Sequence, residues 1–592
     1  MPQSRLLDQL CAVSASSAYA DLPLDPKRNR IRLLDILLSP AKQADIQDPS
    51  HVRCQLRCVD VESAPEFSAL SYTWGHGADR AYISVNGAIT SVTINLESLL
   101  RHLQRSYHVV TVWADALCIN QADDVEKGQQ VQRMHAIYSN ARRTVAWLGP
   151  EGDGSGMAMK VLQSTGQQAL EHGILIHEAL ALSAGLKSQD PAIQGLRSMV
   201  EAVGWVYPFK AVQKLCDRPY WSRLWVLQEY ALAQSISIQC GSSTLSGDQF
   251  NAAYLFLPLL QHHLLETVAE DGDCQVPVQA GADYEVDTDE DGRPLPRVWH
   301  MMNNSGHSRV GYLIRTRRLH DSWQKKSDMT PQKRLCALLE LTNSERTIKS
   351  GAFALGASNA KDRIFGLLGM LGEDAVLGFT IDYHTSDEEK YMAATRWLLF
   401  CGQLSLLSYA HIHPNALMPS WSPVWGNQLR APTVERVFFR PSGTQEGHAL
   451  PIAANIIRLR GVLLDIVIRC GGFWQPEDYD RGFSSAEAGR FLEEVEAMVT
   501  DQSGVPPVLL GMSMEQWQEG AWRIPIADQC RSGIDVEIGD VVSIISGAEA
   551  PLLLRPESQG SAYKIVGESY VYGVMDGEAL TKDTVFTYID IC

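Results

Sequence analysis

The sequence VVTVWADALCI (residues 109–119), with the two segments after it, decides the fold class of this chain. It is a near-continuous apolar run, which is typical of a strand buried on both faces. The polar segment at residues 120–141 carries apolar residues at helical spacing, and RTVAWLG (residues 143–149) is a second apolar strand. Strand, helix and strand within about 40 residues predict a βαβ unit, and therefore a parallel sheet in an α/β fold.

Polar residues at the end of the first strand are candidate site residues. Sheets of this kind place their ligands beyond the carboxyl ends of the strands, and we expect Asp115 to lie there. Asn120 and Gln121 are expected to satisfy backbone groups of the following turn, with Asp123 or Asp124 near the start of the helix.

Cys118 has two interpretations. A nucleophilic cysteine needs a base, usually histidine, within hydrogen-bond reach, and His76 and His135 are the nearest candidates in sequence. A packed residue that shapes the turn is the alternative, because free cysteine is common in protein cores. No metal site is predicted, since the closest cysteine pair, Cys54 and Cys58, alternates along a half-buried strand without a second ligand pair nearby.

The chain divides into four predicted parts around this unit. Residues 1–66 form a strand-rich extension, and the α/β core covers residues 67–255 with a helical insertion at residues 151–218. Residues 256–430 hold an acidic loop and helices. Residues 431–592 form a module of short strands.

Shorter patterns predict individual elements. Asn86-Gly87 lies between two alternating runs, which indicates a β-hairpin, and Asn95 is expected to cap the next helix. Residues 218–234 are predicted to form one helix. Apolar periodicity predicts two more helices at residues 361–371 and 388–400.

Composition excludes some classes of function. The formal net charge of -18 argues against a nucleic-acid partner, because binding phosphates requires clustered Lys and Arg. We find no secretory signal and no apolar run of about 20 residues that could span a bilayer. The twelve cysteines are scattered without regular spacing, which predicts free thiols in a reducing compartment. We therefore expect a cytoplasmic protein without a membrane span.

Four blocks, in this order, resemble the fungal heterokaryon-incompatibility (HET) domain. They are FSALSYTWG (residues 67–75), VWADALCINQADD (112–124), QVQRMHAIYSNARRTVAWLG (130–149) and PYWSRLWVLQE (219–229). Flanking segments also resemble long proteins of this family; they are LPLDPKRNRIRLLDILLSP, KDRIFGLLGM, MPSWSPVW and GESYVYGVMDGEAL. The resemblance implies fungal non-self recognition and programmed cell death signalling, with a protein partner or self-association.

HET domains are in turn thought to be remote relatives of TIR domains, which implies a TIR-like parallel sheet. In many TIR domains the glutamate of a Trp-x-x-x-Glu pattern serves NAD cleavage, and Trp225 and Glu229 match that pattern. Two features depart from it: Ser222 lies three residues before the Trp rather than two, and the insertion at residues 151–218 is absent from ordinary TIR domains.

This resemblance implies a small nucleotide-like ligand, with NAD as the candidate substrate and no other cofactor. The catalytic candidates are Glu229, Asp115 and Cys118. Trp74 or Trp225 could stack on a base or nicotinamide ring. The remaining ligand-binding candidates lie beside them in the matched blocks, and are Gly75, Asn120, Gln121, Ser222 and Arg223.

Three alternatives remain open at this stage. Glu229 could be structural, pairing with Arg223 or capping a neighbouring loop, and the protein would then signal only through its partners. NAD cleavage by Glu229 is the second hypothesis. The third is a biosynthetic or other enzyme that reuses the HET fold with Cys118 as a covalent nucleophile.

Overall fold

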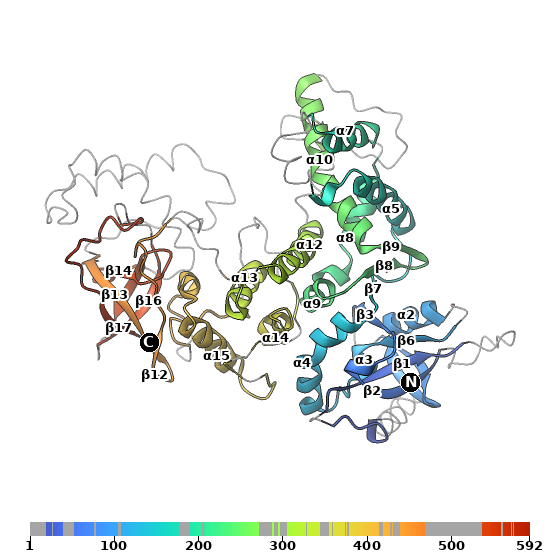
Figure 1. Cartoon of the computed structure of the whole chain (residues 1–592), viewed down its shortest axis with the longest axis horizontal. Coiled ribbons are helices and arrows are strands. Elements are labelled where there is room, and N and C mark those ends of the chain that lie inside the picture. The colour runs from blue at the N-terminus through green and yellow to red at the C-terminus, as the bar shows by residue number, and fades with distance from the viewer. Residues whose placement is uncertain are drawn as a thin grey trace. The chain divides into compact units, whose positions relative to one another are not determined.

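The structure is a computed structural model. It describes residues 19–25, 28–38, 52–75, 79–104, 108–176, 189–203, 207–271, 287–288, 294–295, 305–326, 328–343, 355–357, 359–372, 375, 378–379, 381–413, 418–426, 429, 439–467, 536–557, 561–569, 571 and 574–592. The chain forms two compact units (Figure 1). Unit 1 comprises Met1–Ser327, Leu355–Ser358 and Phe365–Glu373, and unit 2 comprises the rest.

A nine-stranded sheet organises unit 1, in the order β5-β4-β2-β1-β6-β3-β7-β8-β9. The neighbouring strands β6, β3, β7 and β8 are parallel, whereas the pairs at both edges are antiparallel. The strands are β1 (Arg30–Ile36), β2 (Arg53–Asp60), β3 (Ser68–Tyr72), β4 (Arg80–Val85), β5 (Ala88–Thr93), β6 (Val110–Trp113), β7 (Arg143–Trp147), β8 (Ile236–Cys240) and β9 (Ser243–Ser246).

The predicted βαβ unit is confirmed as β6, helix α4 (Asp124–Asn140) and β7. β3 lies between the two strands, so the fold is a mixed α/β sheet with a parallel centre. Strands β1 and β2, from the predicted N-terminal extension, belong to this same sheet, and β1 pairs with β6. Most residues of β1 are buried because it is an interior strand.

The Asn86-Gly87 hairpin is confirmed. Asn86 has φ 51° and Gly87 has φ 83°, which is the left-handed backbone that a two-residue turn between β4 and β5 requires. The expected cap at Asn95 is wrong. Helix α2 (Ile94–Gln104) begins two residues before the expected first helical residue, Leu96, and the Thr93 hydroxyl accepts the Leu96 N–H at 3.3 Å.

The predicted insertion is helical, as expected. It comprises α5 (Ser155–Glu171), α7 (Pro191–Val203) and α8 (Phe209–Cys216). Helix α10 (Gly247–Asp271) packs along α5. The remaining elements of unit 1 are η1 (Val61–Ser63), α3 (Asp115–Cys118), η3 (Pro219–Ser222), α9 (Val226–Ala231), α12 (Ser305–Gln324) and the short pair β10 (Asp287–Thr288) and β11 (Pro294–Leu295). Most of the predicted acidic loop lies outside the described residues.

Unit 2 ends in a β-barrel, which confirms the predicted β-rich module. The strand order is β12 to β17 in sequence, and β13 also pairs with β17, which closes the sheet. Ile457 and Leu459 of β13 face the core, while the alternate residues Arg458 and Arg460 lie opposite Asp590 and Tyr588. The strands are β12 (Leu450–Ala453), β13 (Ile456–Ile466), β14 (Val541–Ile545), β15 (Leu552–Pro556), β16 (Ala562–Glu568) and β17 (Thr587–Ile591).

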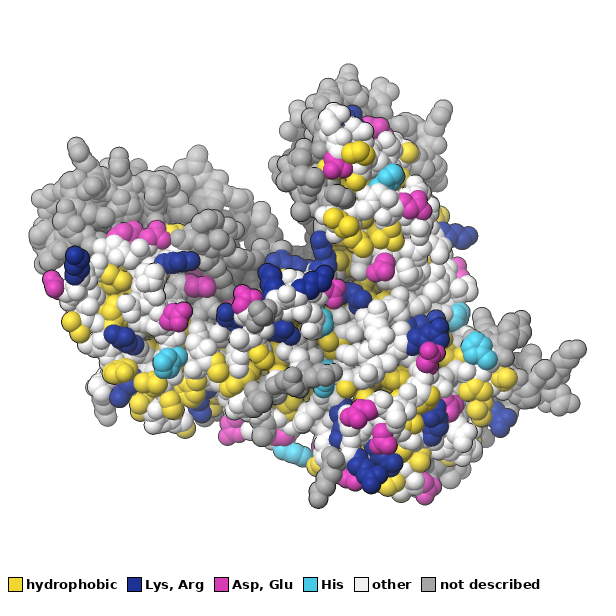
Figure 2. Space-filling view, in the orientation of Figure 1, with side chains coloured by type: hydrophobic (Ala, Val, Ile, Leu, Met, Phe, Trp, Pro, Cys, Tyr) yellow, Lys and Arg dark blue, Asp and Glu magenta, His cyan; other side chains and the backbone are white. Residues whose placement is uncertain are grey.

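Helices precede the barrel in unit 2. The two helices predicted from periodicity are confirmed as α14 (Asp362–Leu368), which contains the boundary between the units, and α15 (Asp387–Phe400). The other elements are α13 (Pro331–Asn343) and η4 (Leu404–Tyr409). Side chains of both charge signs occur across the face drawn in Figure 2, so the net charge of -18 does not make that face uniformly acidic.

Within the described residues, no helix has the length and apolarity that a bilayer crossing requires. No group of three or more His, Cys, Asp or Glu side chains with the geometry of a metal site occurs among the residues that the structure describes. The described cysteines are free thiols, as predicted.

Candidate functional site

Asp115 lies where strand β6 ends, at the carboxyl edge of the parallel strands. The predicted strand is shorter than expected, because the chain turns after Ala114 and Asp115 begins the one-turn helix α3. The N–H groups of Leu117 and Cys118 both donate to the Ala114 carbonyl, at 3.0 and 2.7 Å. The predicted strand-to-helix turn therefore starts at Asp115 rather than after Cys118.

The Asp115 carboxylate is held by two donors. Its Oδ1 accepts the Ala116 N–H at 2.8 Å, and its Oδ2 accepts the indole N–H of Trp74 at 2.8 Å. Trp74 follows β3 and remains 40% exposed. The two candidate site residues Asp115 and Trp74 are thus adjacent, and the partly exposed indole of Trp74 lies at this edge of the sheet.

Asn120 and Gln121 order the turn between α3 and α4, as the sequence predicts. Gln121 Nε2 donates to the Asp115 carbonyl at 2.9 Å, and Asn120 Oδ1 accepts the Ala122 N–H at 3.2 Å. Asp123 is the N-cap of α4 and accepts from Val125 and Glu126. These amides contact backbone groups.

Glu229 lies on the short helix α9, which other segments hold at both ends. The predicted single helix at residues 218–234 is wrong: it consists of η3 and α9 separated by an extended stretch. Arg223 in that stretch forms a β-bridge with Gly356, and the Leu224 N–H donates to the Gly356 carbonyl at 3.0 Å. At the other end, Arg317 donates to the carbonyls of Tyr230 and Ala233 at 2.7 and 2.9 Å.

A buried polar cluster surrounds the Glu229 side chain. The Ser71 hydroxyl from β3 donates to Glu229 Oε2 and lies 2.9 Å from the Tyr220 hydroxyl. The Arg223 guanidinium donates to the Tyr72 carbonyl, next to Ser71 in the chain. Glu229 is 3% exposed, and Tyr72 and Tyr220 are 1% exposed. Glu229 is therefore anchored to the central parallel strand.

Glu229 and Asp115 interact electrostatically within this cluster. Burial raises the pKa of Glu229 to about 7, Arg223 and the Ser71 hydrogen bond oppose the rise, and Asp115 adds to it. Burial alone would lower the pKa of Arg223, but the carboxylates of Glu229 and Asp115 outweigh it and raise that pKa. A carboxyl group that titrates near neutrality can act as an acid or a base there.

Sequence reasoning missed three members of this cluster. Ser71, Tyr72 and Tyr220 lie inside the blocks FSALSYTWG and PYWSRLWVLQE, yet none was singled out. Burial, followed by the carboxylate of Asp115, raises the pKa of Tyr72 well above its ordinary value. Their place in the fold could have identified two of them, because Ser71 and Tyr72 end the strand that lies directly beside β6.

The other predicted ligand-binding residues contribute less. Trp225 packs against the core of the sheet, and the Ser222 hydroxyl donates to the Pro219 carbonyl at 2.7 Å. Gly75 has φ 73°, and a Cβ there would meet no atom within 4 Å.

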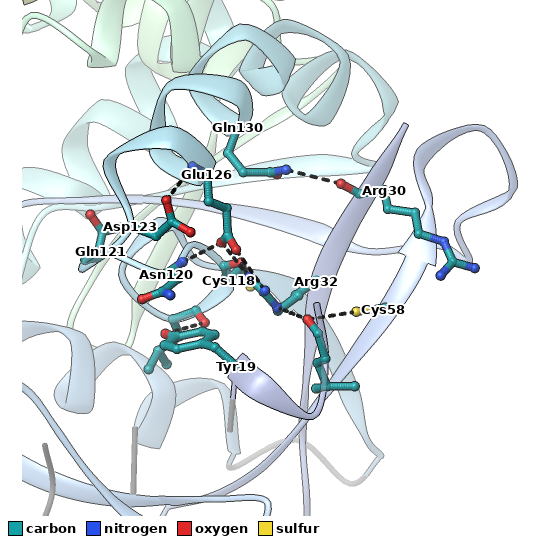
Figure 3. A network of polar contacts seen from close by, with 12 residues as sticks. Tyr19, Arg30, Arg32, Cys58, Cys118, Asn120, Gln121, Asp123, Glu126 and Gln130 are labelled. Atoms are coloured by element: carbon teal, nitrogen blue, oxygen red, sulfur yellow. Dashed lines mark hydrogen bonds and ion pairs between the residues drawn. The ribbon is translucent and has the colours of Figure 1, made fainter. Parts of the chain in front are cut away.

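Cys118 ends helix α3 and belongs to the buried core of the sheet. Its side chain is fully buried, and burial raises the pKa of the thiol to about 12, although the Ala114 N–H donates to Sγ and opposes the rise. Figure 3 shows Cys118 beside Arg32, whose guanidinium donates to the Cys118 carbonyl at 3.2 Å. The ring of His135 contacts the Gln132 carbonyl, and His76 lies outside the described residues.

We expect Cys118 to resist alkylation in the folded protein. Iodoacetamide reacts with thiolates, and a buried thiol with a pKa of about 12 forms almost none at pH 8. Peptide mass mapping should find the exposed Cys401 modified in native protein and Cys118 modified only after denaturation. Modification of native Cys118 as fast as Cys401 would restore the nucleophile hypothesis.

Residues 67–229, which hold β3, Asp115 and Glu229, match the family model of heterokaryon incompatibility protein (HET), and residues 531–586 match that of the Het-6 β-barrel domain. The mixed α/β sheet is thus similar to the HET domain, and the C-terminal barrel is similar to the Het-6 β-barrel domain. The chain is 23% identical over 566 residues to "Heterokaryon incompatibility protein 6, OR allele" of Neurospora crassa, covering 88% of this chain and 77% of that protein. No solved structure matches the chain.

Proposed function

We propose that this chain acts in fungal non-self recognition, with the HET domain triggering growth arrest or cell death in the cytoplasm. The HET match over residues 67–229 carries this proposal, and the likeness to a heterokaryon-incompatibility protein over most of the chain supports it. Recognition would use a protein partner or self-association.

We further propose that the HET domain acts as a TIR-like enzyme that cleaves NAD. The supporting observation is the buried Glu229, tied to Ser71 at the edge of the parallel strands and within the electrostatic field of Asp115. In this reaction the bond between ribose C1′ and the nicotinamide nitrogen breaks and its electron pair neutralises the pyridinium. Water then bonds to C1′ and releases a proton, giving ADP-ribose and nicotinamide.

The residues of the cluster suit the charges of that reaction. Positive charge builds on the sugar as the bond breaks, and a carboxylate such as Glu229 stabilises it. Asp115 can accept hydrogen bonds from ribose hydroxyls, and Trp74 can stack on the adenine or nicotinamide ring. Because Glu229 is only 3% exposed, contact with a sugar requires movement of the side chains around it.

The competing enzyme hypothesis, with Cys118 as nucleophile, has less support. A covalent mechanism needs a thiolate and a base, and the surroundings of Cys118 provide burial and backbone contacts. The cluster around Glu229 is therefore the better candidate for chemistry.

Nicotinamide release from NAD by the purified full-length chain tests the enzymatic proposal. We expect Glu229→Gln to lower the rate by about 100-fold or more, the cost of removing a group that stabilises developing charge. The matched control is Glu62→Gln, at an exposed position. Equal inactivity of wild type and Glu229→Gln, including under conditions that promote self-association, would reject NAD cleavage.

Induced expression in a fungal host separates the two proposals. Growth arrest by wild type but not by Glu229→Gln supports an enzymatic effector. Growth arrest by both supports non-self signalling through protein contacts alone. The wild-type chain should be expressed in both a compatible and an incompatible host strain, so that the incompatible strain supplies the partner. Normal growth of both strains would contradict the role in recognition.

A further inference from the structure

The helix α3, which carries Asp115, is stabilised by residues from outside the segment that matches the HET family. A helix of one turn cannot satisfy its own terminal carbonyls, so they need donors from elsewhere. The Tyr19 hydroxyl donates to the Leu117 carbonyl at 3.1 Å, and Arg32 Nη1 donates to the Cys118 carbonyl at 3.2 Å. Both donors precede residue 67, where the family match begins.

Arg32 connects three segments of the chain (Figure 3). Its Nε donates to the Leu22 carbonyl at 2.9 Å, and its two terminal nitrogens contact the Glu126 carboxylate at 2.6 and 3.0 Å. The guanidinium lies 4.9 Å from the centre of the Tyr19 ring. The side chain of Arg32 is 1% exposed, so this fork holds a single geometry.

Glu126 extends the same network to the turn before α4. Its Oε1 also accepts the Asn120 N–H at 2.7 Å. The segment from Leu117 to Asn120 is therefore held by Tyr19, Arg32 and Glu126 together. A buried ion pair of this kind contributes more to a defined geometry than to net stability.

The opposite end of α3 carries the Asp115 carboxylate, which accepts the Trp74 indole N–H. One helical turn rises only about 5.4 Å, so a shift of the Cys118 carbonyl must move Asp115 as well. We propose that Arg32 and Tyr19 are positioning residues that set Asp115 against Trp74. This inference assumes, with the proposed function, that Asp115 belongs to the site. Tyr19 and strand β1, which carries Arg32, would then be functional parts of the HET domain in this chain.

Two conservative variants of the full-length chain test the proposal. Tyr19→Phe removes the donor to Leu117 but keeps the ring beneath the guanidinium. Arg32→Lys keeps the charge but loses the planar fork. Two variants serve as matched controls. Arg57→Lys changes a more exposed arginine, on β2, which pairs with Asp35 of β1. Tyr588→Phe changes a 65% exposed barrel position.

The first measurement is amide hydrogen exchange of peptides that span residues 112–122. Loss of one net hydrogen bond predicts exchange about fivefold faster in Tyr19→Phe, with peptides of β2 and β4 unchanged. The second measurement is the indole N–H resonance of Trp74, assigned by its absence in Trp74→Phe. It should shift in Tyr19→Phe and Arg32→Lys and stay in place in both controls.

An unchanged Trp74 resonance in both test variants would overturn the positioning role, because the effect of Tyr19 and Arg32 would then not extend from α3 to Trp74. Unchanged exchange at residues 112–122 would overturn it too. Neither measurement depends on enzymatic activity. A wild type that releases no nicotinamide therefore rejects NAD cleavage while leaving the positioning result to stand on its own.

Discussion

Replacing Glu229 with Gln is expected to stabilise unit 1 at pH 8 and to have little effect at pH 4.5. Burial raises the pKa of this carboxyl from its ordinary value of 4.5 to about 7 in the folded chain. As pH rises above 4.5, the Glu229 carboxyl ionises in the unfolded chain but remains protonated in the folded chain. The free energy of unfolding therefore decreases. The penalty levels off above pH 7, at roughly 3 kcal/mol for a shift of this size. Gln carries no charge at any pH and avoids it.

The measurement is the difference between the melting temperatures of the two proteins at pH 4.5, 6, 7 and 8. The difference should grow with pH between 4.5 and 7 and then remain constant. Glu62→Gln, at an exposed position, should show no such trend.

The sign of that difference separates two hypotheses that the sequence left open. If Glu229 served mainly to pair with Arg223, its pKa would be lowered, and Glu229→Gln would destabilise the protein above pH 4.5. A stabilising substitution that also abolishes activity is the behaviour of a functional site, where unfavourable burial is retained for chemistry. Destabilisation at pH 8 would therefore favour the structural interpretation.

Arg32→Leu is expected to be the most destabilising of these changes, by about 3–5 kcal/mol, because it leaves the Glu126 carboxylate buried without its partner. The Glu126 side chain is 11% exposed, and the carbonyls of Leu22 and Cys118 would also lose a donor. Thermal denaturation should show unit 1 melting on the order of 10 °C lower.

Two further variants check the cause of that loss. Arg57→Leu breaks an ion pair in which the arginine side chain is 36% exposed, and it should cost under about 1 kcal/mol. Arg32→Leu combined with Glu126→Leu should recover part of the stability, since no unpaired charge remains. A double variant as unstable as Arg32→Leu would show that lost packing, rather than the buried charge, dominates.

Local sequence patterns predicted much of the fold. The run VVTVWADALCI and the helix after it predicted the βαβ unit of β6, α4 and β7. Asn86-Gly87 predicted its hairpin because a two-residue turn requires positive φ at both positions. The short strands predicted for residues 431–592 include β13, whose Ile457 and Leu459 are buried in the barrel.

Elements set by distant contacts were not predictable in this way. Residues 218–234 have a helical pattern, yet pairing of Arg223 with Gly356 interrupts the helix. Asn95 has the residue type of a helix cap, but its amide instead donates to Thr73 at 2.7 Å and accepts from Trp147 at 2.9 Å. In both cases hydrogen bonds across long sequence separations replaced the local preference.

For the site, sequence alone determined the residue types and the edge of the sheet where they belong. Asp115 follows a predicted parallel strand, and the resemblance of Trp225 and Glu229 to the Trp-x-x-x-Glu pattern of TIR domains points to Glu229. Only the tertiary structure decided their environment. Ser71 reaches Glu229 from 158 residues away, the Tyr220 hydroxyl lies 2.9 Å from that of Ser71, and Arg32 reaches Cys118 across 86 residues. Burial, which shifts the pKa of Glu229 toward neutrality and that of Cys118 far above it, depends on everything packed around a side chain.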